Sequence, residues 1–269
     1  MKIQYCSDLH LEFLENHTFI IENPIKVCGE ILIIAGDLLP ISKINYTVFN
    51  KEISVLCQNF EKVFWIPGNH EYYLSFHQNE NNVFKKPIPS IPNLFMVDNY
   101  SEIIGNTKFI FSTLWSDISE EKAPYIAQYV NDFRQILIVE NDTNEAKLLE
   151  INDFNKLHQT ALDFLKSEIK IAQEQKKIGK IQKIIVTTHY VPTNKYYPEK
   201  YQESIIKEAF VVELDDFILK SEIDYWIHGH HHFNHGNFML GNTKICTNQL
   251  GYVKHNEHEK FRWEHFIEV

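Results

Sequence analysis

The sequence predicts an α/β fold with a mixed sheet system. Short continuous runs of Ile, Val and other apolar residues alternate with segments whose apolar residues recur every three or four positions. Continuous apolar runs are typical of strands that are buried on both faces of a sheet. Towards the C-terminal end, alternating runs follow one another without a helix between them, which indicates an antiparallel part. We expect one domain over residues 1–269, because α/β folds commonly reach this size around a single core.

Strands are predicted wherever a short apolar run is rich in β-branched or aromatic residues. These predicted strands are 2–6, 31–35, 62–66, 108–113, 181–188 and 223–228. The runs that form the antiparallel part are 236–240, 243–247 and 261–269. Gly241-Asn242 separates the first two of these runs and predicts a two-residue hairpin turn.

Helices are predicted at 42–60, 152–178 and 203–220. The second has the clearest periodicity, with apolar residues at three- and four-residue steps on one face. We expect it to begin at Asn152 or Asp153, which are residues that favour helix starts, and to end at Gly179.

Two stretches fit neither a helix nor a strand and are expected to form loops at the rim of a site. Residues 75–93 contain Pro87, Pro89 and Pro92, and proline disfavours a helix interior or a central strand. Residues 190–203 are rich in tyrosine and proline.

Composition limits the partners and the compartment. The formal net charge of −10 disfavours nucleic acid or an anionic membrane as a bulk partner, without excluding nucleic acid. No apolar run approaches the roughly 20 residues that a membrane span needs. The four cysteines form no CxxC pair, so free thiols are expected. The chain opens directly into a predicted strand with no signal-peptide pattern, so a cytoplasmic protein is expected.

Five polar motifs each come directly after an apolar run. They are Asp8-Leu9-His10, Gly36-Asp37, Gly68-Asn69-His70-Glu71, Thr188-His189 and Gly229-His230-His231-His232. Their polar residues are therefore expected at strand ends, where open α/β sheets usually place ligand sites. Two carboxylates, one amide and four imidazoles that converge there would bind two divalent metal ions.

Each motif taken singly also fits an ordinary structural role. Asp8 could cap a turn, Asn69 could be a turn residue after Pro67-Gly68, and His189 could be a structural histidine at a strand end. A buried carboxylate at Asp37 is harder to explain in this way, because an unpaired charge after a fully apolar strand is costly.

The order and identity of the five motifs resemble the calcineurin-like metallophosphoesterase family, whose pattern runs DxH, GD, GNH[DE], H, GHxH. Softer similarities to small bacterial phosphohydrolases of this family lie at residues 114–117, 131–136 and 248–252. The resemblance implies an αββα sandwich, in which two mixed β-sheets are flanked by helices. It also implies a metal-dependent phosphoesterase, in which a pair of divalent ions makes hydroxide at neutral pH for attack on phosphorus.

The resemblance also implies roles for individual residues. One ion would bind Asp8, His10, Asp37 and His232, and the other would bind Asp37, Asn69, His189 and His230. Oxygen and nitrogen ligands without a thiolate fit Mn²⁺, iron, Zn²⁺ or Ni²⁺. His70 would be the catalytic residue that stabilises the transition state and protonates the leaving oxygen. His228 and His231 are expected beside the ligands or on the surface.

The chain departs from the family pattern of protein phosphatases, which extend the second motif to GDxxDRG. Position 40 is Pro40, so the aspartate that orients the catalytic histidine is missing. We hypothesise that Glu71 orients His70 instead. A dedicated phosphoprotein phosphatase is therefore disfavoured.

The expected substrate is a small phosphorylated molecule or a nucleotide, attacked as a phosphodiester or a phosphomonoester. Candidate substrate-binding residues are Arg134, Tyr72, Trp115, Asn248 and Tyr252. A surface ion pair for Arg134 and core positions for the aromatic residues are the plain alternatives. The alternative functions are a nuclease or a catalytically silent scaffold. The oligomeric state is left open.

Overall fold

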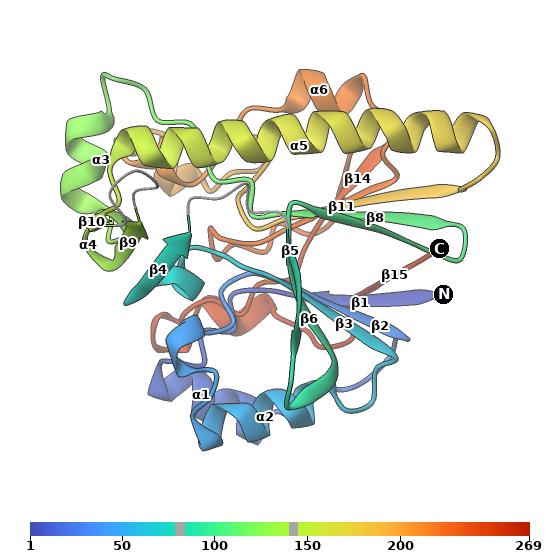
Figure 1. The fold of residues 1–269 in the computed structure, drawn as a ribbon, viewed down its shortest axis with the longest axis horizontal. Coiled ribbons are helices and arrows are strands. Elements are labelled where there is room, and N and C mark those ends of the chain that lie inside the picture. Colours follow the sequence, from blue (N-terminus) through green and yellow to red (C-terminus); the bar gives the residue numbers. More distant parts are fainter. Residues whose placement is uncertain (79–83, 140–144) are drawn as a thin grey trace.

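Two six-stranded mixed sheets lie face to face, and helices cover both outer faces (Figure 1). This arrangement was obtained from a computed structural model, which describes residues 1–78, 84–139 and 145–269. The predicted αββα sandwich is confirmed.

The first sheet has the strand order β15-β1-β2-β3-β6-β5. Its four inner strands run parallel, and both edge strands are antiparallel to their neighbours. In sheet order, the strands are Phe266–Glu268, Lys2–Cys6, Ile31–Ala35, Lys62–Ile66, Ile91–Asp98 and Phe84–Ile88.

The second sheet has the order β13-β14-β12-β11-β8-β7, again with four parallel strands between antiparallel edges. In sheet order, the strands are Phe238–Leu240, Thr243–Thr247, Tyr225–His228, Lys183–Thr188, Thr107–Ser112 and Tyr100–Ile104. A small third sheet, β10-β9-β4, is formed by Ala146–Leu148, Ile136–Val139 and Ser75–Gln78.

Helices α1 and α2 cover the first sheet, whereas α5 and α6 cover the second (Figure 1). The α-helices α1 to α6 are Leu14–Glu22, Thr47–Cys57, Ala123–Tyr129, Asp132–Gln135, Ile151–Lys177 and Asp215–Leu219. Short 3₁₀ helices lie at Ile41–Lys43, His70–Tyr72, Glu199–Tyr201, Lys207–Ala209, Val253–His255 and Glu257–Lys260. No helix in the described part of the chain is both long enough and apolar enough to cross a membrane.

Alternation of side chains explains why the strands are apolar throughout. In β2, Ile31 and Ile33 point into the core between the two sheets, whereas Leu32 and Ile34 point towards the layer of α1 and α2. Both faces of the strand are buried, so the sequence has no polar alternation at this position.

Most of the predicted elements are confirmed. The six early strands appear with small shifts of their ends, and the hairpin at Gly241-Asn242 joins β13 to β14. Helix α5 spans nearly the predicted range; Glu150 and Asp153 form a capping box at its start, and Gly179 follows it with a φ of +74°. The helix predicted at 42–60 is shorter, Thr47–Cys57.

The helix predicted at 203–220 is wrong for most of its length. Backbone hydrogen bonds join Val191 to Phe210 and Val212, and the resulting bridge to Val211 interrupts the helical pattern. Only Asp215–Leu219 and a 3₁₀ turn are helical in this region.

The loop prediction for 75–93 is also wrong for its described part, since β4, β5 and the start of β6 lie there; residues 79–83 lie outside the described residues. Pro87 fits because β5 is an edge strand, and Pro92 stands at the second residue of β6. The C-terminal run departs from the expected antiparallel group, because β15 pairs with β1 of the other sheet.

A buried carboxylate, Asp98, joins the two sheets beside the candidate site. It ends β6 of the first sheet, and its Oδ1 accepts hydrogen bonds from the backbone N–H groups of Asn99 (3.0 Å) and Thr113 (2.7 Å). Thr113 follows β8 of the second sheet and donates its hydroxyl to the carbonyl of Pro67 at 2.9 Å. Burial raises the pKa of Asp98 to about 7.

We predict that Asp98 makes stability fall as the pH rises. The folded-state pKa lies above the unfolded value near 4, so the contribution is complete below about pH 4 and is lost by about pH 7. A tenfold change in proton affinity is worth about 1.4 kcal/mol, so the rise of the pKa to about 7 limits the loss to roughly 4 kcal/mol.

Urea unfolding of wild type and Asp98→Asn between pH 4 and pH 8 measures this effect. Relative to wild type, the unfolding free energy of Asp98→Asn should increase as the pH rises. Asp117→Asn, on an exposed side chain, should run parallel to wild type. A pH-independent difference for Asp98→Asn would contradict the assignment.

Candidate metal centre

The motif residues all follow the carboxyl ends of parallel strands. Motifs after β1, β2 and β3 come from the first sheet, and those after β11 and β12 come from the second. Because the sheets are packed face to face, the two sets of strand ends meet at one edge of the sandwich. The residues that meet there are Asp8, His10, Asp37, Asn69, His189, His230 and His232.

The backbone turns sharply as soon as these strands end. Left-handed φ angles occur at Asp8 (56°), His10 (47°), Asp37 (54°), His230 (80°) and His232 (50°). Such angles are costly for residues other than glycine, and they cluster at functional sites. The chain thus accepts local strain in order to point these side chains at one another.

Glycines in the motifs leave room for the converging side chains. A Cβ on Gly36 would overlap the His189 ring, and a Cβ on Gly68 would overlap both His189 and the Asp37 carboxylate. A Cβ on Gly229 would lie 2.7 Å from Asp8 Oδ2, which is also too close. These positions therefore require glycine for space.

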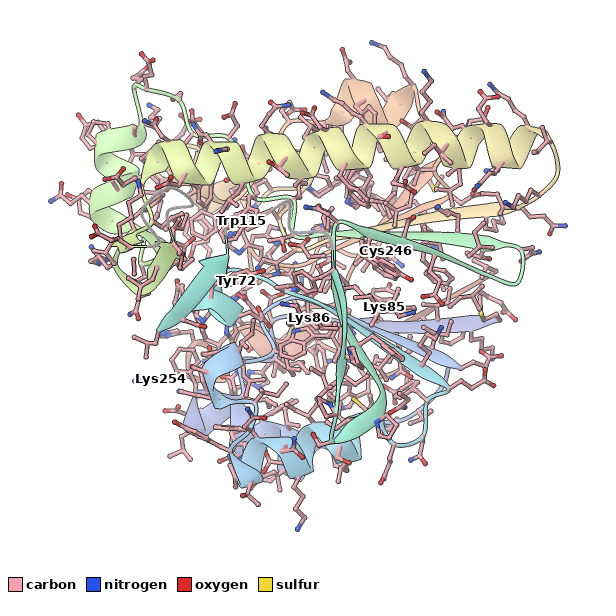
Figure 2. The ribbon with its side chains drawn as sticks, in the orientation of Figure 1. Tyr72, Lys85, Lys86, Trp115, Cys246 and Lys254 are labelled. Carbon is pink, nitrogen blue, oxygen red and sulfur yellow. The ribbon has the colours of Figure 1, made fainter. Side chains whose placement is uncertain are left out.

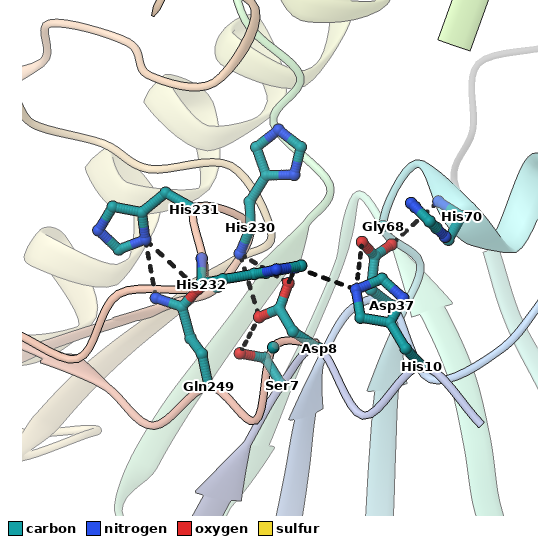
Figure 3. Close-up of polar contacts among 12 residues, drawn as sticks. Ser7, Asp8, His10, Asp37, Gly68, His70, His230, His231, His232 and Gln249 are labelled. Atoms are coloured by element: carbon teal, nitrogen blue, oxygen red, sulfur yellow. Dashed lines mark hydrogen bonds and ion pairs between the residues drawn. The ribbon is translucent and has the colours of Figure 1, made fainter. Parts of the chain in front are cut away.

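The first group of donor atoms comes from Asp8, His10, Asp37 and His232. The Nε2 atoms of His10 and His232 are 3.0 Å apart, and His232 Nε2 lies 3.4 Å from Asp8 Oδ1. Asp37 Oδ2 is 3.7 Å from His10 Nε2. Figure 3 shows these side chains pointing towards a common centre.

The second group contains Asp37, Asn69, His189 and His230. His189 Nε2 is 3.0 Å from His230 Nδ1, 3.2 Å from Asn69 Oδ1 and 3.5 Å from Asp37 Oδ2. The same oxygen of Asp37 therefore faces both groups.

The far nitrogen of each imidazole is held by an oxygen acceptor. His10 Nδ1 is 3.1 Å from Glu12, and His232 Nδ1 is 2.7 Å from Glu257. His189 Nδ1 is 2.9 Å from the Ala35 carbonyl, and His230 Nε2 is 3.3 Å from the Ala209 carbonyl. An N–H donated outward leaves a lone pair on the nitrogen that faces the centre, as metal-binding histidines require.

These donor sets fit divalent metal ions. Two ligands bound to one ion at about 2.1 Å lie roughly 3.0–3.4 Å apart, and the closest donor pairs of both groups have this spacing. Facing lone pairs at 3.0 Å would repel each other without a cation between them. The nitrogen and oxygen donors suit Mn²⁺, iron, Zn²⁺ or Ni²⁺.

Comparison with known proteins identifies the family. The calcineurin-like phosphoesterase family model matches residues 1–234, which is most of the chain. The chain belongs to the calcineurin-like phosphoesterase family. Membership in this metal-dependent family supports metal-dependent hydrolysis of phosphoesters.

Individual proteins are similar to this chain over most of its length. An uncharacterized protein, L509, from Acanthamoeba polyphaga mimivirus is 30% identical over 290 residues, covering 99% of this chain and 96% of that protein. The crystal structure of phosphopantetheinyl hydrolase (PptH) from Mycobacterium tuberculosis has a TM-score of 0.62 at 15% identity, covering 100% of this chain and 95% of PptH. A dimetal phosphatase from Danio rerio has a TM-score of 0.48 at 12% identity, over 93% and 87% of the two chains. The likeness to PptH shows a shared fold.

In this phosphoesterase, His70 lies beside both donor groups. Its Nδ1 is 2.8 Å from Glu12 Oε1, the same oxygen that lies 3.1 Å from His10 Nδ1. Tyr73 stacks on the His70 ring at 4.1 Å, and the Tyr252 hydroxyl is 3.5 Å from its Nε2. Burial opposes protonation, but the negative charges of Asp37 and Glu12 raise the pKa of His70.

The hypothesis that Glu71 orients His70 is wrong, because both Glu71 oxygens are engaged elsewhere. Burial, together with the charge of Asp37, raises the pKa of Glu71 to about 8. Its oxygens accept hydrogen bonds from the backbone of Asp37, Leu38 and Gly68 and from the indole of Trp65. Glu71 therefore fixes the loops after β2 and β3 to each other.

Sequence reasoning missed Glu12, Asp132 and Glu257. Glu12 could have been found from its spacing, because it stands two residues after His10, just as His10 stands two after Asp8. Asp132 lies in the segment 131–136, in which Arg134 is predicted as a substrate-binding residue. It accepts the Asn69 amide N–H at 2.8 Å, which turns Asn69 Oδ1 towards His189.

Only one of the predicted substrate-binding residues lines the cavity beside the donor groups, which has a volume of about 560 Å³. That residue is Tyr252. Tyr72 and Trp115 are core residues beneath α5, where the Trp115 ring is 5.3 Å from Phe154 (Figure 2).

The other two predicted substrate residues also point away from the cavity. The exposed Arg134 guanidinium donates to the Gln128 carbonyl (2.5 Å) and to Asn131 Oδ1 (2.7 Å). Asn248 is buried and donates to the backbone carbonyls of Tyr5 (3.0 Å) and Arg262 (2.8 Å). His228 and His231 are buried, so neither lies on the surface.

We predict that Gly68→Ala weakens metal binding, because its Cβ would displace Asp37 and His189 from the shared centre. Mn²⁺ content after dialysis, measured by mass spectrometry, should fall by at least one ion per chain relative to wild type. Gly105→Ala is the control: its φ of +60° costs about 1 kcal/mol, but no atom lies within 4 Å of the new Cβ. Wild-type metal content in Gly68→Ala would refute the steric argument.

Proposed function

We propose that the protein is a dinuclear metal phosphodiesterase that acts on a small molecule. The observation that carries the proposal is Asp37 Oδ2, which faces both donor groups, with His70 held beside them by Glu12. Family membership supplies the class of reaction, and the geometry of the cavity favours the diester.

Bound divalent ions would supply Lewis-acid stabilisation of the phosphoryl oxygens and an activated water for in-line attack. They would be held by Asp8, His10, Asp37 and His232 on one side and by Asp37, Asn69, His189 and His230 on the other.

His70 would donate a proton to the leaving oxygen. Because Nδ1–H is held by Glu12 at 2.8 Å, the ring presents Nε2 on the side of Tyr252, which lines the cavity. Tyr73 stacks on the ring and restricts its rotation. A positioned general acid of this kind contributes about 10²–10⁴-fold to a rate.

The cavity is lined by residues at both ends of the row of site side chains in Figure 3, with His70 at one end and His231 at the other. The segments 129–132 and 197–210 also contribute to its lining. A diester has a substituent for each end and a monoester for only one, so this extent supports a diester. The cavity volume of about 560 Å³ and the net charge of −10 favour a small molecule over nucleic acid.

Chromogenic esters test the proposal directly. With Mn²⁺, bis-p-nitrophenyl phosphate should be hydrolysed faster than p-nitrophenyl phosphate, and EDTA should abolish both activities. Added Mn²⁺ should restore them. Absence of turnover with every candidate metal would favour a silent scaffold, and faster monoester hydrolysis would refute the diesterase assignment.

Substitutions test the roles of His70 and Glu12. His70→Asn should lower kcat by roughly 100-fold or more for an alkyl leaving group, and less for p-nitrophenolate, which needs no proton. Glu12→Gln should produce a smaller loss with the same dependence on the leaving group. Glu12 also contacts the donor residue His10, so the comparison is made with saturating Mn²⁺ and equal metal content in all variants. Under these conditions the double variant should be no slower than His70→Asn, because the remaining effect of Glu12 on turnover passes through His70.

Mn²⁺ content should stay at the wild-type level in His70→Asn. The matched control is His17→Asn, which removes a histidine paired with Glu52 away from the site and should leave kcat unchanged. Near wild-type turnover in His70→Asn, or additive losses in the double variant, would refute the assigned roles.

A further inference from the structure

The two ends of the candidate site differ in chemistry. His70 and His231 lie at opposite ends of the row of site side chains (Figure 3). At the His70 end, Tyr73 stacks on the imidazole and Asp132 is close by, so this end carries negative charge. At the other end, which we call the His231 end, the rings of Tyr197 (5.7 Å) and Phe233 (6.2 Å) pack against His231.

The His231 end also contains two lysines. Lys260 Nζ lies 5.4 Å from the centre of the Phe233 ring, and Lys200 Nζ lies 4.5 Å from that of Tyr201. Both side chains are exposed and line the same cavity as Asp37 and Asn69.

Neither ammonium group forms an ion pair with a carboxylate in the part of the chain that the structure describes. Within residues 1–78, 84–139 and 145–269, no carboxylate lies within 4.0 Å of Lys200 or Lys260. Neighbouring Lys195 pairs with Asp215 at 3.5 Å. On a chain with a net charge of −10, two unpaired cations in one cavity favour an anionic group there.

The carboxylates near this end do not serve as the anionic partner of the two lysines. Glu257 is occupied by His232 Nδ1 and by the backbone N–H of Tyr252, both at 2.7 Å. Glu259 lines the cavity and is exposed, so solvent screens its electrostatic repulsion of a bound anion.

We infer that the His231 end binds a second phosphate, carried by the part of the substrate that is retained on the reacting phosphorus. Lysine ammonium groups bind phosphate as point charges, and the faces of Tyr197, Tyr201 and Phe233 suit a flat or apolar spacer. The substrate class is thus a phosphodiester with a terminal phosphate, such as a nucleotide ester with a further phosphate on the sugar. This inference rests on the proposed function.

The reaction would leave that second phosphate untouched. A water oxygen bonds to the diester phosphorus as the bond to the leaving oxygen breaks. His70 gives a proton to the leaving oxygen, and the proton lost by water passes to solvent. The retained product then carries both phosphates at the two ends of its spacer.

Two matched substrates test the inference with the full-length, Mn²⁺-loaded protein. They are thymidine 5′-(p-nitrophenyl phosphate) with a free 3′-hydroxyl and the same ester with a 3′-phosphate. For wild type, the 3′-phosphate should raise kcat/KM by about tenfold, mainly through a lower KM. Lys200→Ala/Lys260→Ala should lose this advantage and keep the wild-type value for the 3′-hydroxyl ester.

Two further variants sharpen the result. Lys254→Ala removes an exposed lysine from the same C-terminal segment that does not line the cavity, and it should behave as wild type. Glu259→Gln should increase the advantage of the 3′-phosphate. Equal kcat/KM for the two esters in wild type, or an advantage that survives in the double lysine variant, would overturn the inference.

Calorimetry separates this inference from the proposed function. Mn²⁺-loaded wild type should bind thymidine 3′,5′-bisphosphate about tenfold more tightly than thymidine 5′-monophosphate, and the double lysine variant should bind them equally. If neither ester is hydrolysed but this difference is found, catalysis fails and the phosphate site stands. If the esters are hydrolysed without this difference, the phosphate site fails alone.

Discussion

The structure depends on the convergence of buried donor groups at one edge of two sheets. Asp37 is central, because one of its oxygens lies 3.7 Å from His10 and 3.5 Å from His189, residues that belong to different groups and different sheets. Buried carboxylates and facing imidazole lone pairs are unfavourable together unless cations lie between them. The left-handed backbone angles at five motif residues, and the glycines at which a Cβ would overlap the donor side chains, both allow this arrangement to form.

A ring of oxygen acceptors keeps these groups in position. Glu257 and Asp132 each fix one donor residue, and Glu71 ties together the loops that carry Asp37 and Asn69. Glu12 differs from them because the same oxygen contacts both a donor histidine and His70. In the proposed mechanism, metal binding and proton donation would thus be coupled through a single carboxylate, which would take the role of the aspartate missing at Pro40.

The asymmetry of the cavity gives the proposed reaction a direction. The proposed proton donor, His70, lies at one end (Figure 3), so the leaving group would bind there, and Lys200 and Lys260 lie at the other. The protein would therefore recognise a substrate by the charge on the part that stays attached to the reacting phosphorus. In this proposal, residues of the five motifs would carry out the reaction, and residues outside the motifs would select the substrate.

The sequence by itself determined most of the buried parallel strands, the long helix and the motif residues, because each depends on local periodicity and on residues close in the chain. It missed strands such as β4 and β5, which are defined by their pairing with distant segments. It also indicated which side chains could bind metal. Tertiary structure decided the partners: Glu12 and not Glu71 contacts His70, and β15 crosses to the first sheet. It also buried Trp115, because contacts between residues distant in the chain depend on how the layers pack. A local sequence pattern holds no information about which distant residues come into contact.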